Sequence, residues 1–108
     1  MKKYLSYHPF IIVLFCFVVA QHENSIEELL SKGTAYYNKG DYSNAIIIYE
    51  DILSKQEQEY GNDDAQVAKT MTRLGEMYSL MGMPDISAYY FKQSIIIFEK
   101  SFQTRKEL

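Results

Sequence analysis

The sequence predicts an all-α fold in which two helix-turn-helix units stack as a short solenoid. Five small or aromatic residues recur at one offset of 42 residues: Gly33, Tyr36, Gly40, Ala45 and Tyr49 return as Gly75, Tyr78, Gly82, Ser87 and Phe91. A period of this length is typical of stacked supersecondary units, each too small to bury its own apolar face. Between the glycines, apolar residues follow helical spacing, and no stretch alternates as a strand would. The 108 residues suit a single domain.

The first unit is expected to contain two helices. Ser25 and Glu28 form a capping box that begins the first helix, which runs to about Asn38 and stops before Gly40. Asp41 caps the second helix, which ends by residue 61. The apolar positions of this helix are three and four residues apart: Ala45, Ile48, Tyr49, Ile52 and Leu53.

The second unit repeats this plan. Asp64 caps a third helix over residues 65–81, and Gly82 interrupts the chain again. Pro84 suits the first turn of a fourth helix, which runs to about Thr104. Two runs of three isoleucines, at 46–48 and 95–97, resemble strands when taken alone. Each run lies in a segment of helical length without breakers, so helix is the favoured interpretation.

Residues 1–20 have the three-part layout of a secretory signal peptide. Lys2 and Lys3 give a positive start, residues 10–20 form an apolar run, and Val18 and Ala20 are short side chains before a cleavage site. The run is too short to span a bilayer comfortably, and an uncleaved membrane anchor formed by residues 10–20 is the alternative. We therefore expect an exported protein, periplasmic or secreted, that is free of the membrane after cleavage.

After cleavage the chain is acidic. Removing residues 1–20 leaves nine basic and fourteen acidic residues, so the net charge is 9 − 14 = −5. This composition argues against nucleic acid and anionic lipid as partners, because both need clustered Lys and Arg. Cys16 leaves with the signal peptide, and His8 and His22 lie outside the predicted helices. The predicted helices therefore contain no Cys or His for a nucleophile pair or a transition-metal site, so we expect no catalysis, no cofactor and no metal.

The second unit resembles a tetratricopeptide repeat. The matching residues are Leu74, Gly75 and Tyr78 in the first helix of the repeat and Ser87 and Phe91 in the second. The 42-residue period is similar to the long repeats of kinesin light chains and their bacterial relatives. The resemblance covers two repeats, residues 25–61 and 65–104, and implies a right-handed solenoid in an exported bacterial protein.

The resemblance also implies a function and a binding face. Repeats of this kind bind a protein or peptide on the concave side, which the first helix of each pair lines. The residues placed there are Tyr37, Asn38, Lys69, Arg73 and Glu76. Arg73 and Lys69 suit a carboxylate, and Tyr37 offers an apolar ledge. The alternatives are a solvated face without a ligand, and the N-terminal part of a larger signalling or peptidase-like protein.

The fourth helix is expected to form an interface at the C-terminal edge. It is apolar on two sides, as an internal helix of a solenoid would be, and no polar capping helix follows it within residues 1–108. The edge residues singled out are Tyr90, Ile97, Phe98 and Phe102. We expect a second copy in a homodimer, another protein, or further residues of a longer chain to cover this edge. The alternative is a two-repeat domain that tolerates an exposed patch.

Overall fold

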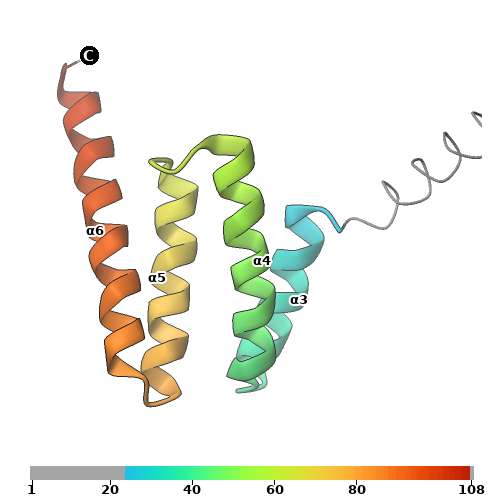
Figure 1. The fold of residues 1–108 in the computed structure, drawn as a ribbon. Coiled ribbons are helices and arrows are strands. Elements are labelled where there is room, and N and C mark those ends of the chain that lie inside the picture. The colour runs from blue at the N-terminus through green and yellow to red at the C-terminus, as the bar shows by residue number, and fades with distance from the viewer. Residues whose placement is uncertain (1–23, 108) are drawn as a thin grey trace, which may run out of the picture.

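The computed structural model describes residues 24–107, and four α-helices make up most of this part of the chain. They are α3 (Ile26–Asn38), α4 (Tyr42–Tyr60), α5 (Ala65–Leu80) and α6 (Pro84–Glu107). Each helix packs against the one before it and the one after it, which arranges the four as a row (Figure 1). The predicted signal peptide lies outside the described residues.

The helices begin and end at the residues that helix-capping chemistry favours. The side chains of Ser25, Asp41 and Asp64 each accept a hydrogen bond from a first-turn backbone N–H, at 3.2, 3.3 and 2.8 Å. Gly40 and Gly82 follow the ends of α3 and α5 with φ angles of 77° and 74°, a conformation that side chains disfavour. The turns that separate the four helices are therefore encoded locally.

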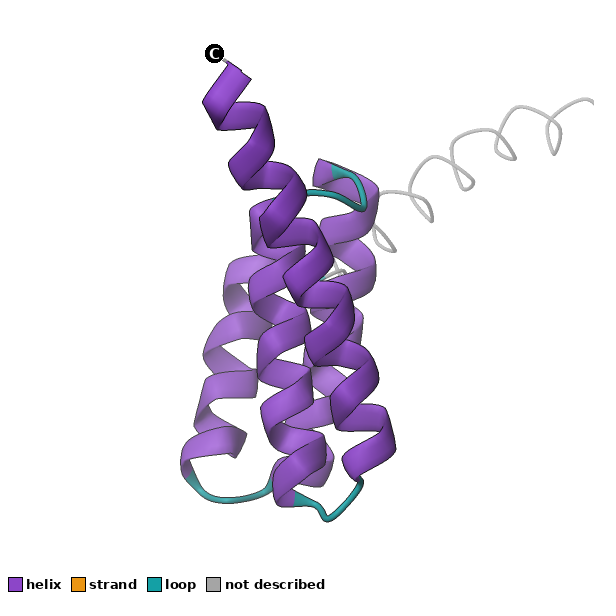
Figure 2. Cartoon of the chain, turned by 90° about the vertical axis from the view of Figure 1, so that its left-hand side faces the viewer, coloured by secondary structure: helices purple, strands orange, loops and turns teal. Residues whose placement is uncertain are grey.

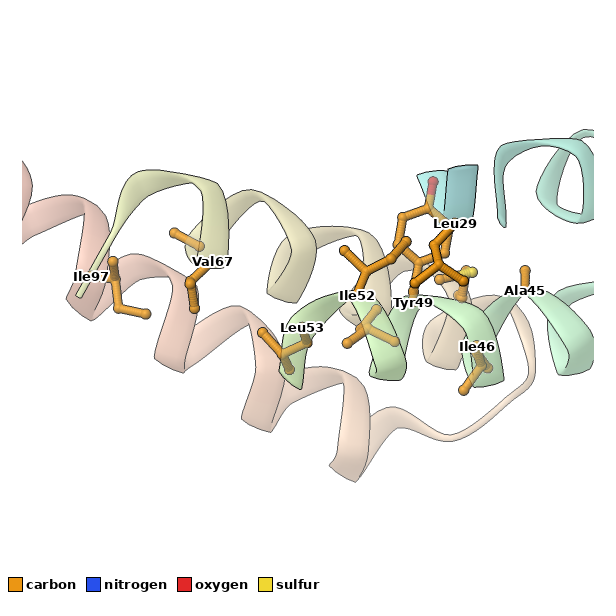
Figure 3. Close-up of a cluster of buried hydrophobic side chains, with 11 residues drawn as sticks. Leu29, Ala45, Ile46, Tyr49, Ile52, Leu53, Val67 and Ile97 are labelled. Carbon is orange, nitrogen blue, oxygen red and sulfur yellow. The ribbon is translucent and has the colours of Figure 1, made fainter. Parts of the chain in front are cut away.

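A single apolar core runs through the row of helices (Figure 3). Its largest fully buried side chains are Ile52 of α4 and Val67, Leu74 and Met77 of α5. Helices α4 and α5 supply most of the core because each has a neighbour on two sides, whereas α3 and α6 stand at the two ends of the row. The two ends are thus the places where a helix can remain uncovered.

The repeated glycines allow close contact between the two helices of each unit. A Cβ atom at Gly33 would lie 2.7 Å from Cε2 of Tyr49, and one at Gly75 would lie 2.8 Å from Cε1 of Phe91. Both distances are too short for a carbon contact, so each aromatic ring occupies the space that the glycine leaves. The Ser87 hydroxyl donates a hydrogen bond of 2.7 Å to the Gly75 carbonyl, which joins α6 to α5.

Helix α6 is longer than the sequence predicts. It continues to Glu107, whereas the predicted end is about Thr104. Its C-terminal turns extend past the ends of the other helices (Figure 2). No glycine or proline between residues 98 and 107 interrupts the helix, so the local sequence permits this extension.

Candidate functional site

The residues predicted to bind a partner lie on α3 and α5, and we call this surface the α3/α5 face. Its centre is Arg73, whose guanidinium carbon lies 4.8 Å from the centroid of the Tyr37 ring. Arg73 also pairs with Glu76 on its own helix, at 2.9 Å from Nη1 to Oε2. Helices α3 and α5 do not pack directly against each other, so the Arg73–Tyr37 contact joins two separate helices across one surface. The structure therefore brings together three of the five predicted residues.

The surroundings of Arg73 favour the protonated, positively charged form of its guanidinium. Burial lowers the pKa of the guanidinium, but the carboxylate of Glu76 and the hydroxyls of Tyr49 and Tyr37 outweigh that effect and raise the pKa overall. Tyr49 reaches this surface from α4, where its hydroxyl lies 3.2 Å from the hydroxyl of Thr34. A positively charged plane, an aromatic ring and two hydroxyls thus lie close together, which suits a carboxylate or a polar peptide group.

The two other predicted residues lie at the border of this cluster. Lys69 and Asn38 are exposed, and no hydrogen bond within the described part of the chain joins either to Arg73. Lys69 precedes Arg73 by one helical turn, so the two cations share a side of α5. Lys69 can therefore contact a ligand held by Arg73, and Asn38 lies next to Tyr37 in the chain.

An acidic groove lies where α3 begins, α4 ends and α5 begins. Its volume is about 720 Å³, and its lining includes three carboxylates: Glu27, Glu59 and Asp64. Ile26 and Leu30 of α3 give it an apolar wall. The sequence does not reveal this groove, because its acidic residues come from three segments. Only the helix order, which places the end of α4 beside the start of α3, brings them together.

A second hollow of about 500 Å³ lies along α4 and is bordered by Tyr90 of α6. The Tyr90 ring stacks on Tyr78, with centroids 5.7 Å apart, and the Tyr78 hydroxyl donates a hydrogen bond of 2.6 Å to Glu50. Burial, followed by the influence of Glu50, raises the pKa of both tyrosines. Tyr90 is half-buried, and its stack on Tyr78 belongs to the packing of α6 on α5 rather than to a free edge.

The residues predicted for the C-terminal edge differ in their exposure. The expectation that Ile97 lies on this edge is wrong, because its side chain is 5% exposed and belongs to the core. Phe98 and Phe102 are exposed, at 40% and 62%. Two sides of α6 are apolar, and packing against α5 covers the side that carries Ile97. The sequence shows two apolar sides but does not indicate which of them α5 covers.

These features define an all-α repeat protein with two stacked helical pairs. A family model for the tetratricopeptide repeat matches residues 25–100, so the chain belongs to the tetratricopeptide repeat family. The predicted fold class, two helix-turn-helix units in a short right-handed solenoid, is confirmed. Proteins of this family generally mediate protein–protein interaction, and their repeats are typically non-catalytic scaffolds. A search of curated proteins finds no match to this chain.

Two further observations concern the described residues alone. None of the helices over residues 24–107 is both long enough and apolar enough to cross a membrane. Within the same range, no group of three or more His, Cys, Asp or Glu side chains is arranged to hold a metal ion.

Proposed function

We propose that this chain is a non-catalytic interaction module that binds an extended peptide segment of a protein partner on the α3/α5 face. The observation that carries the proposal is the Arg73–Tyr37 contact, which makes one recognition surface out of two helices. A peptide carboxylate binds at Arg73 and Lys69, beside the Tyr37 ring.

The charge distribution indicates the chemistry of the peptide. The cationic cluster is at one end of the α3/α5 face, and the acidic groove, with Glu27 and Leu30, is at the other. Tyr37 lies seven residues after Leu30 on α3, a separation of about 10 Å along the helix. The proposed ligand therefore carries an acidic group at one end and a basic or apolar side chain a few residues away.

We further propose that the protein is exported, with residues 1–20 as a cleaved signal peptide, and that its repeats are of the kinesin-light-chain-like type. The layout of the first twenty residues supports export, and the 42-residue period supports the repeat type. The intact mass of the native protein tests cleavage, because removal of residues 1–20 leaves a species of roughly 10 kDa. A much heavier species would support the alternative, an N-terminal part of a larger signalling or peptidase-like protein.

Peptide binding can be tested with an array of peptides in which one acidic and one basic residue are separated by varied spacers. Arg73→Gln keeps most of the side-chain length and removes the charge, so we expect it to weaken the best peptide about tenfold or more. Arg105→Gln, on the distant end of α6, is the matched control. Equal affinity of the wild type and Arg73→Gln for every peptide would exclude this face as the binding site.

A further inference from the structure

The exposed apolar side of α6 corresponds, by the 42-residue repeat, to a side of α4 that is largely buried. We call it the α6 stripe: Phe91, Ile95, Phe98 and Phe102. The positions 42 residues earlier, on α4, are Tyr49, Leu53, Gln56 and Tyr60. Leu53 and Gln56 are 8% and 4% exposed, and Gln56 accepts a hydrogen bond from Thr70 of α5. Ile95 and Phe98 are 56% and 40% exposed. On α4 the two central positions, Leu53 and Gln56, are buried, and Tyr60 at the end is 46% exposed. On α6 the equivalent central positions, Ile95 and Phe98, are largely uncovered within the described chain, whereas Phe91 packs on Gly75 of α5 and is half-buried.

The turn that places α5 on α4 has no counterpart at the end of α6. In the first unit the chain leaves α4 at Gly61, which has a φ of 88°, and Asp64 caps the returning helix. The equivalent residues, Gln103 and Lys106, lie inside α6. Within the described residues, α6 therefore continues as helix past the point at which a covering helix of the first unit folds back.

The opposite end of the row cannot supply that helix. In α5, the side toward α4 carries Val67, Thr70, Leu74 and Met77, all buried. The equivalent residues of α3 are Ser25, Glu28, Lys32 and Ala35, all exposed. Because Glu28 and Lys32 replace Thr70 and Leu74, docking of α3 on the α6 stripe would bury two charged groups, a desolvation cost that pairing of the two with each other only partly offsets. A head-to-tail chain of copies is therefore disfavoured.

A border of alternating charge runs beside the α6 stripe. Asp85, Lys92, Glu99 and Lys106 are seven residues apart, so they lie on one side of the helix, and all four are exposed. Two antiparallel helices related by a two-fold axis bring the same border of each helix together. With the axis midway between residues 95 and 96, Lys92 meets Glu99 of the second copy and Asp85 meets Lys106. In this one alignment every charge of the border meets its opposite.

The same alignment interdigitates the apolar side chains. At a rise of about 1.5 Å per residue, the α6 stripe is about 16 Å long. With primes marking the second copy, the order along the contact is Phe102′, Phe91, Phe98′, Ile95, Ile95′, Phe98, Phe91′, Phe102. Most neighbours in this order are about 3 Å apart along the axis. Side chains from the two copies alternate on either side of the two-fold axis, which is the complementarity that a two-fold interface requires.

We propose that the α6 stripe is the interface of a homodimer in which two α6 helices pack antiparallel about a two-fold axis near Ile95. The apolar stripe supplies the buried contact, and the charged border selects the alignment. The proposal does not depend on the α3/α5 face, and peptide binding there is measured separately.

The test is sedimentation equilibrium of the protein as recovered from the producing cell. We expect the wild type to dimerise at micromolar concentration and Phe98→Asp to be monomeric. The matched control is Ile47→Asp, which changes an isoleucine of α4 that is 65% exposed, and it should leave the dimer intact. Ile97 is unsuitable for the test, because it is buried. Circular dichroism confirms that each variant keeps its helices.

Charge reversal tests the identity of the occupant. Lys92→Glu and Glu99→Lys each place like charges together twice across the two-fold axis, so each should weaken the dimer about tenfold. The double variant restores opposite charges and should regain wild-type dimerisation, which only a second copy of this helix can do. A monomeric wild type would overturn the proposal and leave the stripe to a different protein. A dimer insensitive to Phe98→Asp, or one that the double variant fails to restore, would also overturn it.

Discussion

At the scale of single residues, the two unit glycines make a matched pair with different surroundings. Gly33 faces Tyr49, which is buried and close to the Thr34 hydroxyl. Gly75 faces Phe91, which is half-buried at the border between α5 and the exposed part of the α6 stripe. The same added methyl group therefore meets a confined ring in the first unit and a ring with more freedom in the second.

Gly33→Ala should lower the free energy of unfolding by about 1–3 kcal/mol, because the new Cβ overlaps the confined Tyr49 ring. Gly75→Ala should cost less, since Phe91 is only half-buried and can move outward. Urea unfolding of both variants measures the difference, and Ser31→Ala on the exposed side of α3 is the control. A larger loss for Gly75→Ala than for Gly33→Ala would contradict this account of the two sites.

The Tyr78 hydroxyl gives the fold a dependence on alkaline pH. Burial and the hydrogen bond to Glu50 raise the pKa of Tyr78 above its ordinary value of about 10. The folded state therefore keeps this proton longer than the unfolded state does. The contribution of Tyr78 to stability is complete below about pH 10 and declines as the pH rises above that value.

We expect the free energy of unfolding to fall between neutral pH and about pH 11. The fall should be shallower in Tyr78→Phe, which has no hydroxyl proton to lose. Urea titrations at several alkaline pH values compare the two slopes, and Tyr60→Phe serves as a control because Tyr60 is 46% exposed. Equal slopes for wild type and Tyr78→Phe would show that the Glu50 contact has no such role.

At the scale of helices, one buried polar contact fixes how α4 and α5 meet. The Thr70 hydroxyl donates to the Gln56 side-chain carbonyl at 2.6 Å, and both residues are 4% exposed. All other buried side-chain polar atoms in the described residues are also paired. Loss of one partner here leaves the other unsatisfied, which costs more than the hydrogen bond itself contributes.

Thr70→Val keeps the shape of the side chain and removes its hydroxyl, so it should lower the free energy of unfolding by about 1–3 kcal/mol. Gln56→Leu should cost less, because the Thr70 hydroxyl can turn to a backbone carbonyl of its own helix. The double variant should recover much of the loss from Thr70→Val. Chemical denaturation of the three variants gives the coupling energy, and additive losses would contradict a direct contact.

Features of the helices that depend on neighbouring residues could be predicted from the sequence, and features that depend on packing between helices could not. The helix starts at Ser25, Asp41 and Asp64 depend on bonds within three residues, so local sequence was sufficient. The burial of Ile97 depends on which side of α6 receives α5, a tertiary fact that two equally apolar sides conceal. The acidic groove was missed for a similar reason, because it exists only where three helix ends meet.

For the α3/α5 face, the residues could be predicted from the sequence, but the distance between them could not. The resemblance to tetratricopeptide repeats implied a set of five binding residues, because the first helix of each pair lines the concave side in that family. These residues are Tyr37, Asn38, Lys69, Arg73 and Glu76. The contact of 4.8 Å between Arg73 and the Tyr37 ring adds what the pattern lacks, namely the distance between successive units.

At the scale of the whole molecule, the two ends of the solenoid have opposite character. The outer side of α3 carries Glu28 and Lys32, whose equivalents in α5 are buried, whereas the outer side of α6 is apolar. A solenoid with one polar end and one apolar end can add a partner at one end only. In the proposed assembly, a few charged side chains, rather than the shape of the fold, disfavour growth by repeated head-to-tail addition.

This reasoning predicts the effect of making the first end resemble α5. The double variant Glu28→Thr with Lys32→Leu installs the α5 residues on α3, so its outer side becomes able to dock on the α6 stripe. Such a contact joins different surfaces of two copies and does not close on itself, so assemblies larger than a dimer should grow with concentration. Light scattering measures their size.

The control variant is Glu27→Thr with Ser31→Leu. It makes similar changes at positions equivalent to the exposed Lys69 and to Arg73, and it should not assemble further. If both variants assemble alike, added surface hydrophobicity rather than repeat equivalence is the cause, and the two charges do not protect this end.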